Sequence, residues 1–137
     1  MHETLEQIKK IILWYRDKST TATIDQLLKA RDKLATYNYT IAEQFADFNK
    51  SAKVAYGIRK IGIACEVNKL TKAGETHSKA DSLAIEEKKD IITEEKLNES
   101  IADSLYIKLK YSSEVVRAIE QRIAVLRKEL EQREDQT

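Results

Sequence analysis

The segment EVVRAIEQRIAVLRKELEQRE, residues 114–134, has the most regular helical pattern in the chain. Its apolar residues are spaced three and four apart, at Val116, Ile119, Ile123, Leu126 and Leu130. This spacing places them in one narrow line along a helix, which is typical of a coiled-coil seam. An apolar seam needs a cover, which can be another part of the chain, a second copy of it or a different molecule.

The composition of the whole chain also favours helices. Its 137 residues include no proline and three glycines, Gly57, Gly62 and Gly74. Average proteins contain roughly 5% proline and 7% glycine, so residues that break helices are depleted here. Charged residues make up 34% of the chain and aromatic residues 7%. This balance indicates long solvent-exposed helices rather than a globule with a thick core.

Two polar interruptions divide the helical pattern. The segment DKSTTAT, residues 17–23, separates a short amphipathic helix within residues 1–20 from a long helix over 23–70. Thr4 with Gln7, and Thr23 with Gln26, have the spacing of N-terminal capping pairs for these two helices.

The second interruption is LTKAGETHS, residues 70–78. Gly74 can end a helix in the left-handed conformation, and Thr76 can cap the next helix. We therefore predict a turn over 71–76 and a last helix over 77–134. A kink near residues 90–93 stays open as an alternative, because Thr93 followed by two glutamates resembles a new helix start.

Together these elements predict a single all-α domain, in which a short N-terminal helix accompanies two long helices folded as an antiparallel coiled-coil hairpin. Residues 1–72 carry 13 Lys and Arg against 8 Asp and Glu (+5), and residues 73–137 carry 11 against 15 (−4). Opposite charges on the two halves favour their pairing. Such a thin hairpin buries little surface, so we expect a homo-oligomer in which the terminal seam is partly shared between copies. We expect Gly57 and Gly62 to mark close packing against a neighbouring helix, with a bend of the long helix as the alternative.

The sequence contains no apolar run near the roughly 18 residues that a membrane span requires. A single cysteine, Cys65, cannot form an internal disulfide and fits a reducing compartment. Its neighbours Ile63, Ala64 and Val67 suggest a small buried hydrophobic residue. We therefore expect a soluble cytoplasmic protein that does not enter membranes.

Signatures of catalysis and cofactor binding are missing from the sequence. His2 and His77 have no ligand partner at metal-site spacing, and the isolated glycines form no phosphate-binding loop. Acidic runs such as Glu86–Glu87 alternate with lysines, as on a solvated helix face. We expect no enzyme activity, no metal and no cofactor.

Basic residues next to tyrosines are the one indication of a nucleic-acid partner, in YIKLKY at residues 106–111 and on a helical face further upstream. Lys53, Tyr56 and Lys60 share one helical face, and Arg59 lies beside them. Cations and aromatic rings together can hold single-stranded nucleic acid through phosphate contacts and base stacking. The simpler interpretation is that the tyrosine borders the core while lysine stems cover it.

The other candidate surface is a protein interface. Ile11, Trp14 and Tyr15 concentrate apolar and aromatic area on the short first helix, and such residues often anchor interfaces. The terminal seam from Val116 to Leu130 is a second apolar surface for a partner or another copy. The simpler interpretation is that the first helix closes the bundle.

From about Lys53 to residue 134 the chain has an Ala- and charge-rich helix, a Gly-x-Thr turn and an R-I-x-x-L-R-x-E ending. The residues that form this layout are Gly74, Thr76, Ala80, Ala84, Arg122, Ile123, Leu126, Arg127 and Glu129. In these features the chain resembles small helical proteins of tailed bacteriophages and prophages. This resemblance implies a non-enzymatic accessory role near recombination or replication genes, or inhibition of a host factor, in the host cytoplasm.

Three functional hypotheses follow. The first is an oligomeric binding or scaffolding protein that is accessory to nucleic-acid metabolism. The second is a protein-binding module that inhibits or bridges a host protein. The third is a structural component of a virion.

Overall fold

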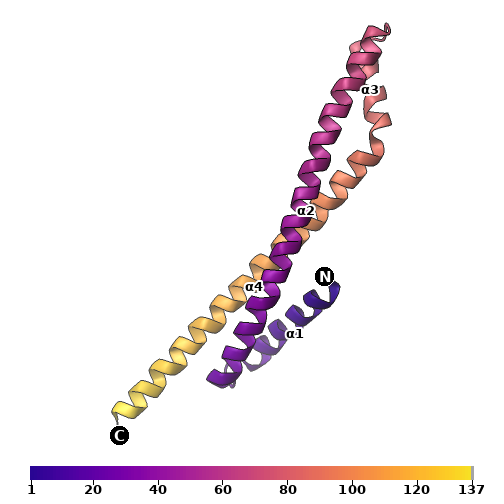
Figure 1. Cartoon of the computed structure of the whole chain (residues 1–137). Coiled ribbons are helices and arrows are strands. Elements are labelled where there is room, and N and C mark those ends of the chain that lie inside the picture. The colour runs from indigo at the N-terminus through magenta and orange to yellow at the C-terminus, as the bar shows by residue number, and fades with distance from the viewer. Residues whose placement is uncertain (137) are drawn as a thin grey trace. The chain divides into compact units, whose positions relative to one another are not determined.

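The computed structural model describes residues 1–136, and these form four helices and no strand (Figure 1). The helices are α1 (His2–Lys18), α2 (Ile24–Lys72), α3 (His77–Glu87) and α4 (Lys89–Asp135). The predicted all-α class is confirmed, and the two long helices pack together. The chain divides into two compact units: unit 1 is residues 1–44 with the chain from Leu105 onward, and unit 2 is residues 45–104.

The start of α2 is fixed by the predicted capping pair. The Thr23 hydroxyl accepts a hydrogen bond from the Gln26 N–H at 3.2 Å, and the Gln26 side chain accepts one from the Thr23 N–H at 3.0 Å. This reciprocal arrangement satisfies two donors that a helix start would otherwise leave unpaired. The capping role expected for Thr4 is wrong, because α1 already begins at His2 and has no side-chain cap.

The turn between α2 and α3 has the geometry that its sequence indicates. Gly74 has a φ of +100°, in the region that favours glycine. The N–H of Glu75 donates to the Leu70 carbonyl at 3.1 Å, which forms the long hydrogen bond of a Schellman ending. The Thr76 hydroxyl then accepts from the Lys79 N–H at 3.3 Å and caps α3.

The chain beyond the turn forms two helices rather than one. α3 ends at Glu87, and Lys88 leaves the helical conformation with φ −94° and ψ 13° before α4 begins. The interruption therefore lies at Lys88, and residues 90–93 are helical. Thr93 caps nothing there, because its hydroxyl donates back to the Lys89 carbonyl at 2.9 Å.

The core of unit 1 is formed by α1, the first part of α2 and the last part of α4. The buried apolar side chains of this unit are Ile8, Ala22, Leu27, Ala30, Leu34, Ile41, Leu105, Ile119 and Ile123. α1 is held against α4 by the Tyr15 hydroxyl, which donates to the Ala118 carbonyl at 3.3 Å. Arg122 also donates to the Ser19 carbonyl, just after α1, at 3.1 Å. Both hydrogen bonds tie the N-terminal segment to α4.

A polar pair interrupts this apolar core. The Ser112 hydroxyl of α4 donates to the Asn38 side-chain oxygen of α2 at 2.6 Å, and both residues are buried. Buried polar groups are tolerated when they are paired, and a lost partner costs more than the hydrogen bond itself gains. This pair therefore favours one register of α2 against α4 within unit 1.

Unit 2 has a thinner core of small side chains. Its buried apolar residues are all alanines, at Ala52, Ala55, Ala80, Ala84 and Ala102. Cys65 is exposed, so the prediction that it is buried is wrong. The close packing expected at Gly57 is also wrong, because no atom lies within 4 Å of an added Cβ there. Gly62 does have a close neighbour, the Cε of Lys88 at 3.0 Å.

The buried polar pair of unit 1 gives a stability prediction. Ser112→Ala removes the donor and leaves the buried Asn38 oxygen unpaired, which should lower the free energy of unfolding by about 1–3 kcal/mol. The double variant Asn38→Leu with Ser112→Ala should lose less than Ser112→Ala alone, because no polar group is then stranded. Urea unfolding followed by circular dichroism measures both, and equal losses would contradict the proposed role of the pair.

Candidate interaction surfaces

The basic face proposed from the sequence lies on α2 in unit 2. Lys53, Tyr56 and Lys60 are exposed there, whereas Arg59 is half-buried. The Tyr56 ring has the Arg59 guanidinium 4.9 Å and the Lys60 ammonium 5.7 Å from its centroid. Both distances are within the range of cation–π attraction. The structure thus brings the four residues together, with the tyrosine ring next to two of the cations.

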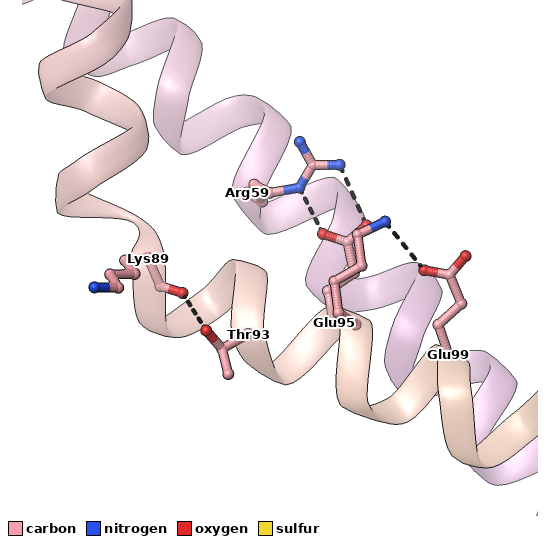
Figure 2. A network of polar contacts seen from close by, with 6 residues as sticks. Arg59, Lys89, Thr93, Glu95 and Glu99 are labelled. Carbon is pink, nitrogen blue, oxygen red and sulfur yellow. Dashed lines mark hydrogen bonds and ion pairs between the residues drawn. The ribbon is translucent and has the colours of Figure 1, made fainter.

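Arg59 has a second partner, Glu95 of α4. Only 4% of the surface of Glu95 is exposed to solvent. The Arg59 guanidinium donates to both carboxylate oxygens, from Nε at 2.5 Å and from Nη2 at 3.2 Å (Figure 2). A two-point contact of this kind fixes the orientation of both side chains. The charge of Arg59 is thereby committed to a contact within unit 2, which leaves Lys53 and Lys60 as the exposed cations of this face.

The ion pair shifts the pKa values of both residues so that each charged form is favoured. Hydrogen bonds from Arg59 hold the pKa of Glu95 below its ordinary value, although burial acts in the opposite direction. The same hydrogen bonds raise the pKa of Arg59, which stays protonated at any working pH. Next to this pair, Lys96 and Glu99 form an exposed ion pair of 3.5 Å (Figure 2), which screening by water weakens.

The lowered pKa of Glu95 predicts a pH dependence of stability. A carboxylate with a lowered folded-state pKa stabilises the fold above its unfolded-state pKa, near 4.5, and loses this contribution as pH falls through the folded-state pKa. Between pH 7 and pH 3 the melting temperature of the wild type should therefore fall further than that of Glu95→Gln. Thermal unfolding by circular dichroism measures this difference. Glu99→Gln is the matched control and should follow the wild-type curve; parallel curves for wild type and Glu95→Gln would contradict the assignment.

The terminal seam is largely covered within unit 1. Ile119 and Ile123 are buried, Val116 and Leu126 are half-buried, and Leu130 is exposed. The cover is provided by the other helices of the same unit, since α1 and the start of α2 lie against this part of α4. Other helices of the same chain therefore cover most of the terminal seam, and only its end near Leu130 is exposed.

Of the aromatic residues of α1, Trp14 lines a groove, whereas Tyr15 donates a hydrogen bond to α4. Ile11, Trp14 and Tyr15 are half-buried. Trp14 and Ile11 line a groove between α1 and α2, together with Lys10 from α1 and Gln26, Lys29, Ala30 and Lys33 from α2. The lysines of this groove were not singled out from the sequence, because they come from two helices whose packing angle the sequence does not give.

A further surface was missed at the sequence level. Val54, Ile58 and Ile61 on α2 are spaced four and three apart and are exposed in unit 2, whereas Ala52 and Ala55 of the same helix are buried. The spacing was visible in the sequence. However, two apolar lines run along this helix, and the sequence does not reveal which of them faces the rest of the unit.

Within the described part of the chain, no group of three or more His, Cys, Asp or Glu side chains is arranged to hold a metal ion. None of the helices over residues 1–136 combines the length and the apolar character of a membrane span.

Comparison with known proteins gives no relative. No protein-family model matches the sequence, and no curated protein or solved structure is significantly similar to it. The functional proposal therefore depends on the surfaces described above.

Proposed function

We propose that this chain is a non-catalytic scaffold, an antiparallel coiled-coil hairpin that binds an acidic amphipathic helix of a partner protein. The binding site is the groove between α1 and α2 in unit 1. One observation supports this choice: the groove has an apolar floor at Ile11 and Trp14, three lysines line it, and no carboxylate does.

The chemistry of the groove suits a helix with one apolar and one acidic face. Apolar side chains of such a helix can cover the half-buried Trp14, and aromatic residues in partly formed pockets are common anchors. Lys10 and Lys33 take part in no ion pair among residues 1–136, and Lys29 has only an exposed contact with Asp25. Their charges are therefore available to carboxylates of a partner, which they would also attract from a distance.

Trp14 is the single tryptophan of the chain, so its fluorescence reports directly on the groove. The probe is a synthetic helix with leucines at positions i, i+3, i+4 and i+7 and glutamates elsewhere. It should shift the Trp14 emission to shorter wavelength and bind more weakly as salt rises. The same peptide with lysines in place of the glutamates should bind at least about tenfold more weakly, a difference of about 1.4 kcal/mol.

Two double variants separate this site from the basic face of unit 2. Lys10→Glu with Lys33→Glu should reduce binding of the acidic helix, and Lys53→Glu with Lys60→Glu should leave it unchanged. Circular dichroism checks that both variants stay helical. Equal binding of the acidic and basic peptides, or insensitivity to the change at Lys10 and Lys33, would refute the groove as a protein-binding site.

The second candidate function is binding of single-stranded nucleic acid at the basic face of unit 2. The observation that favours it is that Lys53 and Lys60 are exposed next to Tyr56, which is itself 45% exposed. The two lysines would contact phosphates, and the tyrosine would stack on a base. Such binding would fit one of the two roles that the resemblance to phage-encoded helical proteins implies, an accessory role near recombination or replication genes; the other is inhibition of a host factor.

Titration with a fluorescent oligothymidine tests the second candidate. If Lys53 and Lys60 contact phosphates, their joint change to glutamate should lower the affinity and reduce the slope of log K against log salt by about 1.4. Lys10→Glu with Lys33→Glu is the matched control and should bind as the wild type does. The idea fails if both double variants bind the oligonucleotide alike.

A further inference from the structure

Unit 2 has an unusual distribution of side-chain size. The apolar residues that it buries are alanines, whereas larger aliphatic side chains are half-buried, as at Ile63, Ile91 and Ile101, or exposed. The exposed ones are Val54, Ile58, Ile61, Leu83, Ile85 and Leu97. Ile61 is 69% exposed, and Val54 and Ile58 are each 53% exposed. Contiguous exposed apolar residues on a folded unit mark a surface that another molecule covers.

The exposed residues of α2 form a single line. Val54, Ile58 and Ile61, followed by the exposed Cys65, have gaps of four, three and four residues. We define these four residues as the α2 stripe. The gaps are those of a coiled-coil seam, which packs best against another helix with a seam of the same kind.

The α2 stripe and its surroundings are symmetric about the point between Arg59 and Lys60. Seven residues before Val54 lies the exposed Asp47, and seven residues after Cys65 lies the exposed Lys72. From Asp47 to Lys72 the gaps are 7, 4, 3, 4 and 7, so they are the same in either direction. The two ends, however, carry opposite charges.

This symmetry identifies the occupant of the stripe. We propose that the α2 stripe is the interface of a homodimer, in which a second copy packs antiparallel about a two-fold axis between Arg59 and Lys60. A two-fold interface places each residue opposite its mirror position. Val54 then faces Cys65 of the second copy, and Ile58 faces Ile61 of the second copy.

The charged ends complete this pairing. In the same register Asp47 faces Lys72 of the second copy, and by symmetry the contact forms twice. Asp47 and Glu94 line one groove beside Val54 and Ile58, together with Lys50, so this end of the stripe carries two carboxylates and one ammonium group. A parallel arrangement would instead place Asp47 against Asp47 and Lys72 against Lys72. Electrostatic complementarity therefore favours the antiparallel orientation.

The two glycines that border the stripe differ in their surroundings. Gly57 faces Gly62 of the second copy in this register, and Ser51 faces Asn68. The space around an added Cβ at Gly57 is open, whereas the Cε of Lys88 lies 3.0 Å from an added Cβ at Gly62, so the flexible Lys88 side chain has to turn aside for a close approach. The register also brings Lys50 towards Lys69 of the second copy. Their long flexible stems allow the two ammonium groups to turn apart into solvent.

Disulfide trapping of Val54→Cys tests the register in the full-length chain. With Cys65 of the second copy opposite, mild oxidation should give a dimer with two symmetric cross-links, and reduction should reverse it. An internal disulfide is excluded, because residues 54 and 65 lie about 16 Å apart along one helix and a disulfide spans about 6 Å between Cα atoms. Non-reducing electrophoresis and thiol titration measure the product.

Two controls make this experiment decisive. The wild type carries only Cys65, which is offset by about 16 Å along the helix axis from Cys65 of the second copy in the antiparallel register, so it should stay uncross-linked. Lys53→Cys places an exposed thiol one residue away from Val54 but off the stripe, and it should also remain monomeric on the gel. Efficient cross-linking of the wild type would overturn the antiparallel register. Cross-linking of Val54→Cys no better than that of Lys53→Cys would overturn the interface.

A charge exchange gives an independent measurement. Asp47→Lys and Lys72→Asp should each weaken the dimer, by about tenfold for two repelling contacts, and the double variant should restore it. Analytical ultracentrifugation measures the dissociation constant.

Substitutions of exposed isoleucines test the apolar part of the interface. Ile61→Glu should abolish the dimer. Ile107→Glu should not, because Ile107 is a 67% exposed residue of α4 in unit 1 and lies off the stripe. A chain that stays monomeric throughout, or that dimerises through Ile107, contradicts the proposal. These variants leave the α1–α2 groove intact, so this proposal can fail without affecting the proposed function.

Discussion

The hydrogen bond from Ser112 to Asn38 is the contact on which the arrangement of unit 1 depends. Leucine and isoleucine side chains are similar in shape, so an apolar seam alone tolerates a shift of one helix by a turn. A buried polar pair does not, because a shift leaves both groups without a partner in a low-dielectric environment. The burial of Leu34 and Ile41, and the hydrogen bond of Tyr15 to Ala118, both belong to the register that this pair selects.

Unit 2 uses a different means to the same end. Its buried apolar side chains are alanines, which contribute little area each, and the contact between α2 and α4 relies on the two-point pairing of Arg59 with Glu95. A paired buried carboxylate is a weak source of net stability, since desolvation offsets much of the attraction. Its value lies in orientation, because a guanidinium accepts a carboxylate in a defined plane. Unit 2 is therefore specified by geometry more than by buried area.

The features that the sequence predicted were those with a local cause. The Thr23–Gln26 cap, the left-handed Gly74 and the Thr76 cap each depend on residues within a few positions of one another.

The features that the sequence did not predict depend on contacts across the chain. The burial of Asn38 requires knowledge of Ser112, and the exposure of Cys65 requires knowledge of which apolar line of α2 faces inward. The interruption at Lys88 also lacks a local signal, since neither proline nor glycine stands there; the Lys88 side chain instead extends over Gly62. Of the candidate surfaces, residue types were predictable, but their grouping into a groove or a symmetric stripe was not.

The separation of contacts along the sequence has a consequence for how the chain acquires its structure. In unit 2 the pairing of Arg59 with Glu95 joins residues 36 apart, whereas in unit 1 the contacts of Asn38 and Tyr15 join residues 74 and 103 apart. Closing a longer open loop costs more conformational entropy, and contacts between distant residues form later. Once unit 2 has formed, residues 45–104 no longer count as an open loop. We therefore expect folding to begin at the turn around Gly74 and to proceed outward along both helices, with α1 docking last.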